Sequence, residues 1–396
     1  MNGATGRYLV LLSTQEPQRA NKTLAEHADV QVIASQDIEA AKKQGIRLDA
    51  RCAVVYEHIG VAILRCEPDA GQRLQAAASA ADQGILAIEP ERRVHAIGTQ
   101  RMPRHAGPSV TADETLSTWG VQLTGAAASA YTGAGIRVAI LDTGLDQQHP
   151  DFDGRVIVAR SFVDGADVYD GNGHGTHCAG IAMGPSHPGR PPRYGVAGEA
   201  DMYIGKVLGD EGGGSDGEVL DGINWAVENG CHIISMSLGS AVQPGQGYSR
   251  IFEEVARRAM AAGTIMIAAA GNDSHRPAMI APVSHPANCP SIIAVAAIDE
   301  HLEIAPFSCG GLADEGGEVN IAAPGVAVDS SWPVPQLRQT ISGTSMAAPF
   351  VTGIAALFAQ SRPEVRGRQL LDLLIGQARP LALSRRDAGA GLVQAP

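Results

Sequence analysis

Continuous apolar runs recur along the last two thirds of the chain, each short enough for a single strand. They cover residues 135–141, 202–208, 233–238, 264–270 and 292–297. Such runs are typical of parallel strands that are buried on both faces. The segments 219–229 and 250–262 between them have the pattern of helices. This alternation predicts an α/β fold, a mostly parallel sheet with helices on both faces.

The N-terminal part of the chain has a different pattern. Strand-like runs cover residues 8–12, 53–66 and 85–97, and helix-like segments cover 36–44 and 71–82. We expect residues 1–97 to form a small β-α-β-β-α-β unit. Residues 98–116 hold two prolines and two glycines among few large apolar residues, which indicates an exposed linker. The main domain is then expected over residues 117–396.

Composition and charge exclude several classes of protein. Of the 396 residues, 44% are hydrophobic, which is enough for a sizeable core, and the 47 glycines suit a loop-rich α/β enzyme. The net charge of −12 argues against nucleic acid and anionic membrane surfaces as partners. No apolar run approaches the roughly 18 residues that span a bilayer.

The first residues and the cysteines favour a cytoplasmic location. The apolar run at residues 8–12 is too short for a signal peptide. The six cysteines contain no CxxC pair, so neither a zinc site nor a dense disulfide framework is expected. They are Cys52, Cys66, Cys178, Cys231, Cys289 and Cys309. Free thiols fit a reducing compartment.

A short polar motif stands directly before an apolar, helix-like segment near the C-terminus. Gly343 and Thr344 lead to Ser345, and apolar residues follow at helical spacing as far as Phe358. We expect Ser345 in the first turn of a buried helix, where unpaired N–H groups and partial positive charge favour an oxyanion. Ser345 is thus a candidate nucleophile. The alternative is that it only caps the helix.

Asp142 follows the first apolar run of the main domain, in the sequence Asp-Thr-Gly. A carboxylate at the end of a buried strand is held by rigid backbone and is partly desolvated. Asp-Thr-Gly also occurs in aspartic peptidases, but these need two such carboxylates, and the chain has no second copy. The other alternative is an aspartate that only forms a turn.

His174 lies in a cluster of small residues, Asp-Gly-Asn-Gly-His-Gly-Thr-His-Cys, which leaves its ring open to a substrate. His174 and His177 are an alternative pair of metal ligands. A metallopeptidase helix, however, has its histidines at i and i+4 with a glutamate between them. Cys178 is an alternative nucleophile, but its apolar neighbours favour an inert, packed thiol.

Asn272 follows the apolar run at 264–270 and supplies an amide donor, although Asn-Asp is also a common turn pair. Along the chain come Asp142, His174, Asn272 and Ser345. A hydroxyl nucleophile needs a base, the base needs an orienting carboxylate, and the tetrahedral intermediate needs donors. These four residues fill each role once.

The sequence around these residues resembles that of the subtilisin family of serine peptidases. The stretches VAILDTGLDQQHPDF, GHGTHCAG and SGTSMAAP surround the aspartate, the histidine and the serine, in the subtilisin order. IISMSLGS, AAAGN and GAGLVQA also match, so the resemblance covers residues 118–395. It implies a subtilisin-like fold. By size, strand order and position, residues 1–97 resemble the family's propeptide, a small ferredoxin-like α+β inhibitor and folding aid.

The resemblance also implies the roles of individual residues. Ser345 would be the nucleophile, His174 the general base and then acid, and Asp142 the group that orients His174. Asn272 and the Ser345 backbone N–H would bind the oxyanion. Two strands would pair with the substrate backbone; they contain Gly212, Gly213 and Gly214, and Ser237, Leu238 and Gly239. Ala269, Ala270, Gly271 and Ser284 would form a primary pocket without charged residues, so a neutral or apolar specificity is implied. Asp210 and Glu211 at its neighbouring subsites would favour basic residues.

Calcium is the one ion that the resemblance implies, as a structural ion, since catalysis needs no cofactor. The loop at residues 183–192 offers almost no oxygen ligands where the family's strong site lies, and Asp151 matches only one outlying ligand. Asp299, with carbonyls near Pro282, matches a second family site and is the candidate metal ligand.

The propeptide resemblance predicts that the chain cuts itself once between residues 97 and 116. Ile97 would enter the primary pocket and Val94 an apolar subsite, although a β-branched residue is stiff there and favours a later cut at Gln100 or Met102. The N-terminal domain would then inhibit the enzyme, which we expect to be a monomer acting on proteins or peptides. Two alternative functions are a catalytically silent peptide-binding module and an esterase. The esterase motif Gly-x-Ser-x-Gly is broken at Ala347.

Overall fold

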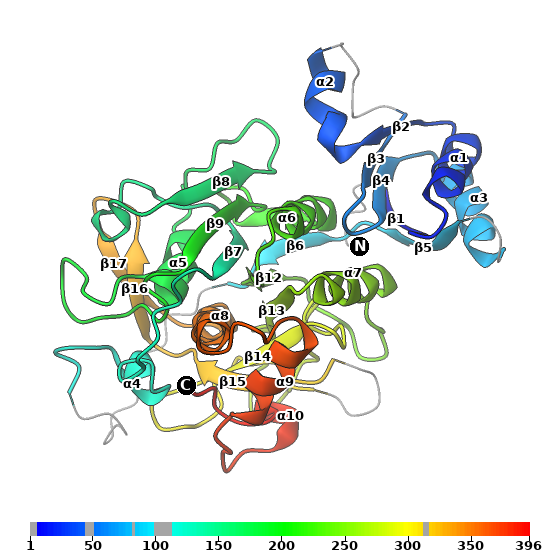
Figure 1. Cartoon of the computed structure of the whole chain (residues 1–396). Helices are drawn as coiled ribbons and strands as arrows, with labels where there is room; N and C mark the ends of the chain where they lie inside the picture. The colour runs from blue at the N-terminus through cyan, green and yellow to red at the C-terminus, as the bar shows by residue number, and fades with distance from the viewer. Residues whose placement is uncertain (1–5, 44–50, 81–83, 99–112, 312–316) are drawn as a thin grey trace.

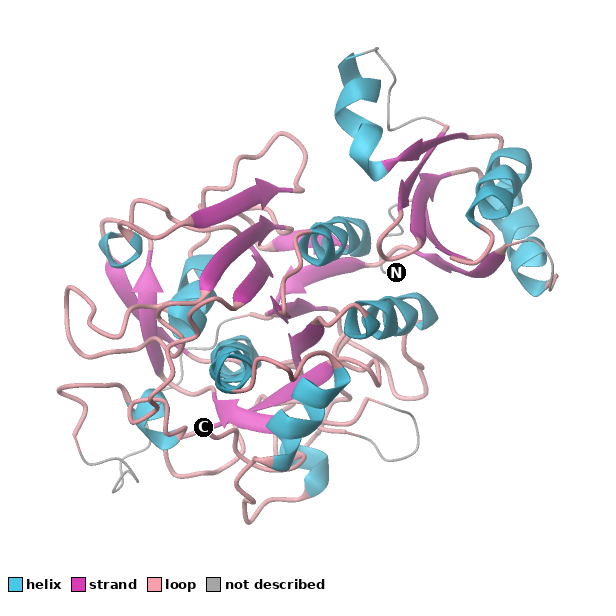
Figure 2. Ribbon diagram, viewed as in Figure 1, coloured by secondary structure: helices cyan, strands magenta, loops and turns pink. Residues whose placement is uncertain are grey.

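The computed structural model describes residues 6–43, 51–80, 84–98, 113–311 and 317–396. Figure 1 shows a small N-terminal unit beside a larger one, with a single strand running from the first into the second. In Figure 2 the strands of the larger unit form a central sheet flanked by helices.

The larger unit is built on a seven-stranded sheet in which every neighbouring pair is parallel. In spatial order its strands are β15 (Ile321–Pro324), β14 (Ile293–Ile298), β13 (Ile265–Ala269), β11 (Ile233–Met236), β7 (Arg137–Asp142), β9 (Asp201–Lys206) and β8 (Ile157–Ser161). The predicted α/β fold class is confirmed. Five of the strands were predicted. The edge strands β8 and β15 were not, because β8 is half exposed and β15 has only four residues.

The longest helix of the described chain, α8 (Thr344–Ser361), crosses the middle of this sheet and contacts β11, β13, β14 and β15. It is buried from Thr344 to Ala359, as expected of a helix that is apolar all round. α5 (His174–Met183) packs against it. The other helices of the unit are α4 (Trp119–Leu123), α6 (Asp216–Glu228), α7 (Arg250–Ala261), α9 (Arg368–Gly376) and α10 (Arg385–Ala388). A separate hairpin of β16 (Val328–Trp332) and β17 (Leu337–Ile341) lies against α5.

The N-terminal unit has its own five-stranded sheet, in the order β2 (Gln31–Ala34), β3 (Cys52–Tyr56), β4 (Val61–Arg65), β1 (Arg7–Leu12) and β5 (Ile85–Pro90). The last four are antiparallel in a ferredoxin-like order, and β2 adds a parallel edge strand. Helices α1 (Pro17–Ala28) and α3 (Pro68–Ser79) pack together, and α2 (Ile38–Lys43) lies near β2. α1 and β2 were not predicted, and the run 53–66 is a hairpin rather than one strand.

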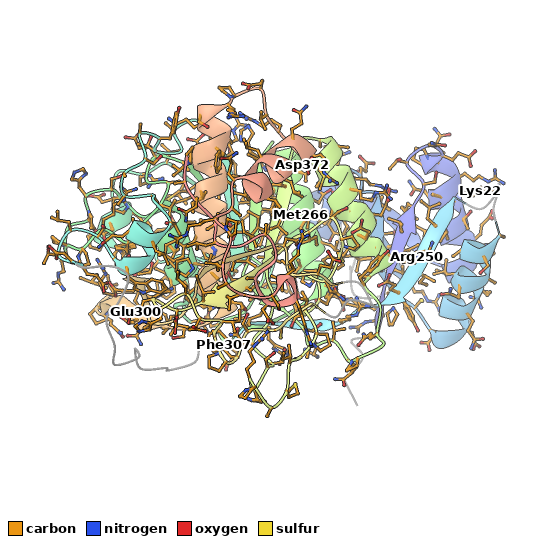
Figure 3. The ribbon with its side chains drawn as sticks, turned by 90° about the horizontal axis from the view of Figure 1, so that it is seen from below. Lys22, Arg250, Met266, Glu300, Phe307 and Asp372 are labelled. Atoms are coloured by element: carbon orange, nitrogen blue, oxygen red, sulfur yellow. The ribbon has the colours of Figure 1, made fainter. Side chains whose placement is uncertain are left out.

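The run 85–97 also divides, with a consequence for the site. Its first part is β5, but its second part, β6 (Arg93–Ala96), leaves the N-terminal sheet. β6 pairs antiparallel with β10 (Gly213–Ser215) on one side and with β12 (Leu238–Gly239) on the other. In Figure 1 it enters the larger unit between α6 and α7. Figure 3 shows the N-terminal unit beside α7 at Arg250, whose backbone N–H donates to Glu89 at 2.8 Å.

Candidate active site

Three side chains meet where the central strands end. Asp142 is the last residue of β7, His174 the first of α5 and Ser345 the second of α8. Nδ1 of His174 lies 2.7 Å from Oδ1 of Asp142, and both side chains are buried. Asp142 Oδ1 also accepts from the Thr143 N–H at 2.7 Å. The structure therefore brings together a carboxylate, an imidazole and a hydroxyl from three distant parts of the sequence.

Electrostatics separates the two histidines of the motif. Burial alone would lower the pKa of His174, but the adjacent charge of Asp142 outweighs it and holds that pKa well above its usual value. Burial lowers the pKa of His177 to about 3, and its Nε2 lies 3.0 Å from the Gln339 carbonyl oxygen. His177 is therefore neutral, and its hydrogen bond faces the β17 strand instead of Asp142.

Cys178 lies under His174, with its Sγ 3.9 Å from Nδ1. Its Sγ, His174 Nδ1 and a carboxylate oxygen of Asp142 fall within 4.8 Å of one another, a grouping of the kind that holds a metal ion. Burial, however, raises the pKa of the Cys178 thiol, and a metal ligand or a nucleophile must be the thiolate. The direct Asp142–His174 hydrogen bond accounts for the grouping without an ion.

The backbone at Ser345 is shaped by a proline inside α8. Pro349 has no N–H to donate to the Ser345 carbonyl one turn earlier. That carbonyl instead accepts from the Ser237 hydroxyl at 2.8 Å and from the Cys178 thiol at 3.5 Å. Ser237 therefore has a second role, because it fixes the turn that carries Ser345.

The hydroxyl of Ser345 points at the inserted N-terminal segment. Its Oγ lies 3.1 Å from the carbonyl oxygen of Ile97 and 3.1 Å from that of Ser237. Nε2 of His174 has no hydrogen-bond partner among the described residues. Bonds between a catalytic base and its nucleophile are often long before the reaction begins. The three side chains thus share one site, with the Ser345 hydroxyl turned toward a peptide carbonyl.

Asn272 is held so that its amide nitrogen faces the same segment. Its Oδ1 accepts from the N–H of Thr344 at 3.0 Å and from the Thr344 hydroxyl at 2.9 Å. Nδ2 then donates to the carbonyl oxygen of Gly98 at 2.8 Å. A fixed amide donor therefore lies beside the peptide, on the carbonyl that follows Ile97.

The two predicted substrate strands flank β6. His95 stands opposite Gly213 of β10 and Gly239 of β12. The pairing continues at both ends: the Ala96 N–H donates to Gly212 O at 2.8 Å, and the Ile97 N–H to Ser237 O at 3.3 Å. The remaining predicted wall residues, Gly214 and Leu238, face Val94 and Ala96 in the same register. A Cβ on Gly239 would lie 2.3 Å from the His285 carbonyl oxygen, so only glycine fits there.

The residues of the predicted primary pocket also lie together. The Ser284 N–H donates to Ala270 O at 2.8 Å, and a Cβ on Gly271 would lie 2.2 Å from Ser284 Oγ. Ala269 precedes them at the end of β13. A carboxylate lies next to this pocket, because the Ser284 hydroxyl donates to Asp273 Oδ2 at 3.3 Å. Asp273 directly follows Asn272, and its sequence indicates only a turn.

The sequence analysis did not identify two further side chains of the site, Asp170 and Lys206. Asp170 accepts from the Gly173 N–H at 2.8 Å and the Thr176 N–H at 2.7 Å, so it fixes the loop that leads into α5. Its place in the His174 motif was the available signal. Lys206 is buried, and its Nζ donates to Thr143 O at 2.5 Å and to Asp210 at 2.7 Å. Asp210 is thus already paired with a cation, which weakens its expected role toward basic substrate residues.

Both Asp151 and the candidate calcium ligand Asp299 already accept hydrogen bonds within the protein. Asp151 accepts from the Gly189 N–H at 2.9 Å and from the Tyr194 hydroxyl at 2.7 Å, so the loop itself occupies this carboxylate. Asp299 Oδ1 accepts from the N–H groups of His301 at 2.9 Å and Glu303 at 3.0 Å. Asp299 stays a candidate ligand.

Comparison with known proteins decides the family. The model of the Subtilase family matches residues 133–392, which include all four residues proposed from the motifs. The chain belongs to the subtilase family. It is a subtilisin-type serine endopeptidase. The chain is 38% identical to Subtilisin Savinase of Lederbergia lenta over 282 residues, 70% of this chain and 96% of that protein. It is 36% identical to Subtilisin DY of Bacillus licheniformis over 252 residues, 63% of this chain and 86% of that protein.

A solved structure resembles the subtilase described here over nearly its whole length. It is that of fervidolysin from Fervidobacterium pennivorans, described as a keratinolytic enzyme related to subtilisin. The two share a TM-score of 0.75 at 24% identity, over 98% of this chain and 60% of the fervidolysin chain. At this identity the likeness shows a common fold.

The relatives correct the expected cytoplasmic location, which is wrong because they are secreted extracellular subtilisins. The free thiols do not indicate the compartment. All six cysteines are free and five of them are buried, and a buried thiol is inert whichever compartment the protein is in. Among the described residues, no helix is both long and apolar enough to cross a bilayer.

Proposed function

We propose that this subtilase hydrolyses peptide bonds through Ser345, His174 and Asp142. Ser345 Oγ attacks the substrate carbonyl, and His174 takes its proton and then gives it to the leaving amine. Asp142 holds the His174 tautomer and stabilises the imidazolium. The observation that carries this proposal is the position of Ser345 Oγ, 3.1 Å from a peptide carbonyl in a site that also contains the Asp142–His174 pair.

Asn272 and the Ser345 backbone N–H are proposed to stabilise the oxyanion. Asn272 Nδ2 is held by the two bonds from Thr344 and already donates to a peptide carbonyl. During the reaction it would move its hydrogen bond from the Gly98 carbonyl to the oxyanion that forms at Ile97. Thr344 holds the Asn272 side chain throughout, so only the oxygen that accepts from Nδ2 changes in this step.

The substrate is proposed to be a protein or peptide that binds as an added strand between β10 and β12. The register of β6 supports this arrangement, because both walls pair with it through backbone groups that any sequence offers. The small residues Ala269, Ala270 and Gly271 support a preference for neutral or apolar residues in the primary pocket. Asp273 accepts a hydrogen bond from Ser284 of this pocket.

The enzyme is proposed to be made as a zymogen whose residues 1–97 are the propeptide and residues 117–396 the peptidase domain. β6 occupies the groove, Val94 is 1% exposed, and the Ile97 N–H and carbonyl contact Ser237 and Ser345. These contacts favour the bond between Ile97 and Gly98 as the one that is cut. The later positions, Gln100 and Met102, lie outside the described residues. Until it leaves, the segment blocks the groove and inhibits the enzyme.

A calcium ion at Asp299 and a monomeric state remain predictions of the family resemblance. The subtilase reaction itself needs no cofactor.

Labelling with a fluorophosphonate tests the proposed triad. After incubation of the full chain, the probe should attach to Ser345, as read by peptide mapping. The labelling rate should rise with pH, with a midpoint above the usual histidine value of about 6.5. The sign follows from the raised pKa of His174: the ring keeps its proton to higher pH, and only the neutral ring accepts the Ser345 proton.

His177→Gln is the matched control for this measurement. His177 is already neutral at all working pH values, so its replacement should leave the midpoint unchanged. Attachment at another residue, or a rate that does not depend on pH, would contradict the assignment.

A further inference from the structure

A buried carboxylate contacts the inserted segment well upstream of the catalytic residues. Asp216, the first residue of α6, has a fully buried side chain. Its Oδ2 accepts from the backbone N–H of Arg92 at 3.0 Å, and its own N–H donates to the Arg92 carbonyl at 3.0 Å. Asp216 therefore binds one residue of the segment through both backbone groups, one residue beyond the end of β10.

The side chain of the same residue also faces this carboxylate. Nη1 of Arg92 lies 3.8 Å from Asp216 Oδ2, and the Arg92 side chain is one quarter exposed. Its other acidic neighbour is Glu89, with Oε2 at 3.4 Å from Nη2. Glu89 belongs to the N-terminal unit and leaves with it. The first residue of a separate peptide in the groove would therefore lie near the carboxylate of Asp216 but not near that of Glu89.

His285 holds the side chain of Asp216 in place. The Nε2 of His285 lies 2.9 Å from Asp216 Oδ1, and both side chains are buried. The His285 backbone exchanges two hydrogen bonds with Ser240, which follows β12. The ring of Phe252 packs edge-on against His285, with centroids 4.6 Å apart. The hydrogen bond between Asp216 and His285 thus connects the two walls of the groove. It keeps the Asp216 carboxylate directed at the bound backbone.

Counting back from Ile97, Arg92 is the sixth residue of the segment. We infer that Asp216 is a specificity-determining residue, which binds the backbone of the sixth residue before the cut bond and favours arginine or lysine there. The inference rests on the proposed function, since it takes the inserted segment as the path of a substrate. A carboxylate that accepts a peptide N–H forms a charge-assisted hydrogen bond, which is stronger than a neutral one. The preference for a basic side chain comes from the partly exposed ion pair between Arg92 and Asp216. This ion pair contributes less binding energy than the backbone hydrogen bond.

The test uses N-acetylated hexapeptide anilides with the sequence of residues 92–97, with leucine last and with arginine, glutamine or glutamate first. The acetyl group leaves the first residue with the peptide N–H that Asp216 would bind. The full chain is incubated until turnover is constant, and active sites are counted with a fluorophosphonate. For the wild type we expect kcat/KM to fall from arginine to glutamine by about threefold and further to glutamate. Asp216→Asn should remove this order, and Glu218→Gln should keep it.

Glu218→Gln is the matched control because it removes a charge from the same helix. Glu218 accepts from the Ser215 hydroxyl at 2.6 Å and lies 3.9 Å from Arg7, a residue of the N-terminal unit. If Glu218→Gln removed the order of kcat/KM as fully as Asp216→Asn does, the preference would come from the overall negative charge of this region and not from Asp216. Equal kcat/KM for the three hexapeptides in the wild type would overturn it, even if Asp216→Asn did not fold.

A tetrapeptide anilide that ends the same way, without the first two residues, distinguishes a failure of this inference from a failure of the proposed function. It lacks the residue that Asp216 would bind, so Asp216→Asn and the wild type should cut it equally. If the wild type cuts the tetrapeptide but does not distinguish the hexapeptides, only the present inference fails. If it cuts no peptide at all, the proposed function fails.

Discussion

Ser345→Ala is expected to abolish peptide hydrolysis while the chain stays folded. The loss in kcat should be about 10⁶-fold, the size known for the nucleophile of subtilisin itself. The hydroxyl reaches the inserted segment, and its two neighbours are the carbonyl oxygens of Ile97 and Ser237. Removing it leaves no buried donor unpaired, and alanine is a good helix former. Turnover of a peptide anilide and the melting temperature measure the two effects.

Ser342→Ala is the matched control for this variant. Ser342 is equally buried, three residues earlier, and its Oγ accepts from the Ala327 N–H at 2.8 Å. Its loss should lower the melting temperature, because a buried N–H is left without a partner, yet kcat should stay within a few-fold of the wild type. A Ser345→Ala enzyme with measurable turnover close to the wild type would remove Ser345 from the mechanism.

Asn272→Ala should lower kcat with little change in KM. The expected loss is roughly 100- to 1000-fold, the range known for the matching asparagine of subtilisin. The reason lies in the geometry: Thr344 fixes the amide, so Nδ2 is aimed before the oxyanion forms. The bond is stronger to the charged oxyanion than to a ground-state carbonyl, so its loss affects the transition state more than substrate binding.

Asn229→Ala offers a comparison of like chemistry. The Asn229 amide also donates to a backbone carbonyl at 2.8 Å, that of Trp225, but at the far end of α6. Its replacement should leave kcat unchanged. If Asn272→Ala changed only KM, Asn272 would be a ground-state contact and the oxyanion would need another donor.

Much of the larger unit could be predicted because its signals are local. Buried parallel strands are apolar along their whole length, so β7, β11 and β13 were visible, and each polar residue that follows one could be placed at the same sheet edge. The helix at Ser345 was visible for the same reason. α1 was missed because large apolar residues are few in it and its buried face is mainly small.

The features that sequence reasoning missed depend on contacts between distant residues. Asp216 and His285 are 69 residues apart, and nothing near either one indicates the other. The apolar pattern did not predict the division of the run 85–97, because β6 pairs with β10, more than a hundred residues later; only the propeptide resemblance indicated that this segment lies in the groove. The expected cytoplasmic location was wrong for a different reason, because free thiols that are mostly buried do not indicate a compartment.

The central claim is that this subtilase binds its own segment 92–97 as a substrate and cuts it with Ser345. The most direct measurement is the intact mass of the wild type and of Ser345→Ala, incubated side by side. We expect the wild type to give two fragments that meet between Ile97 and Gly98, and Ser345→Ala to keep its full mass. A wild-type chain that stays whole while it hydrolyses peptides at full rate, or a Ser345→Ala chain cut at the same bond, would contradict the claim.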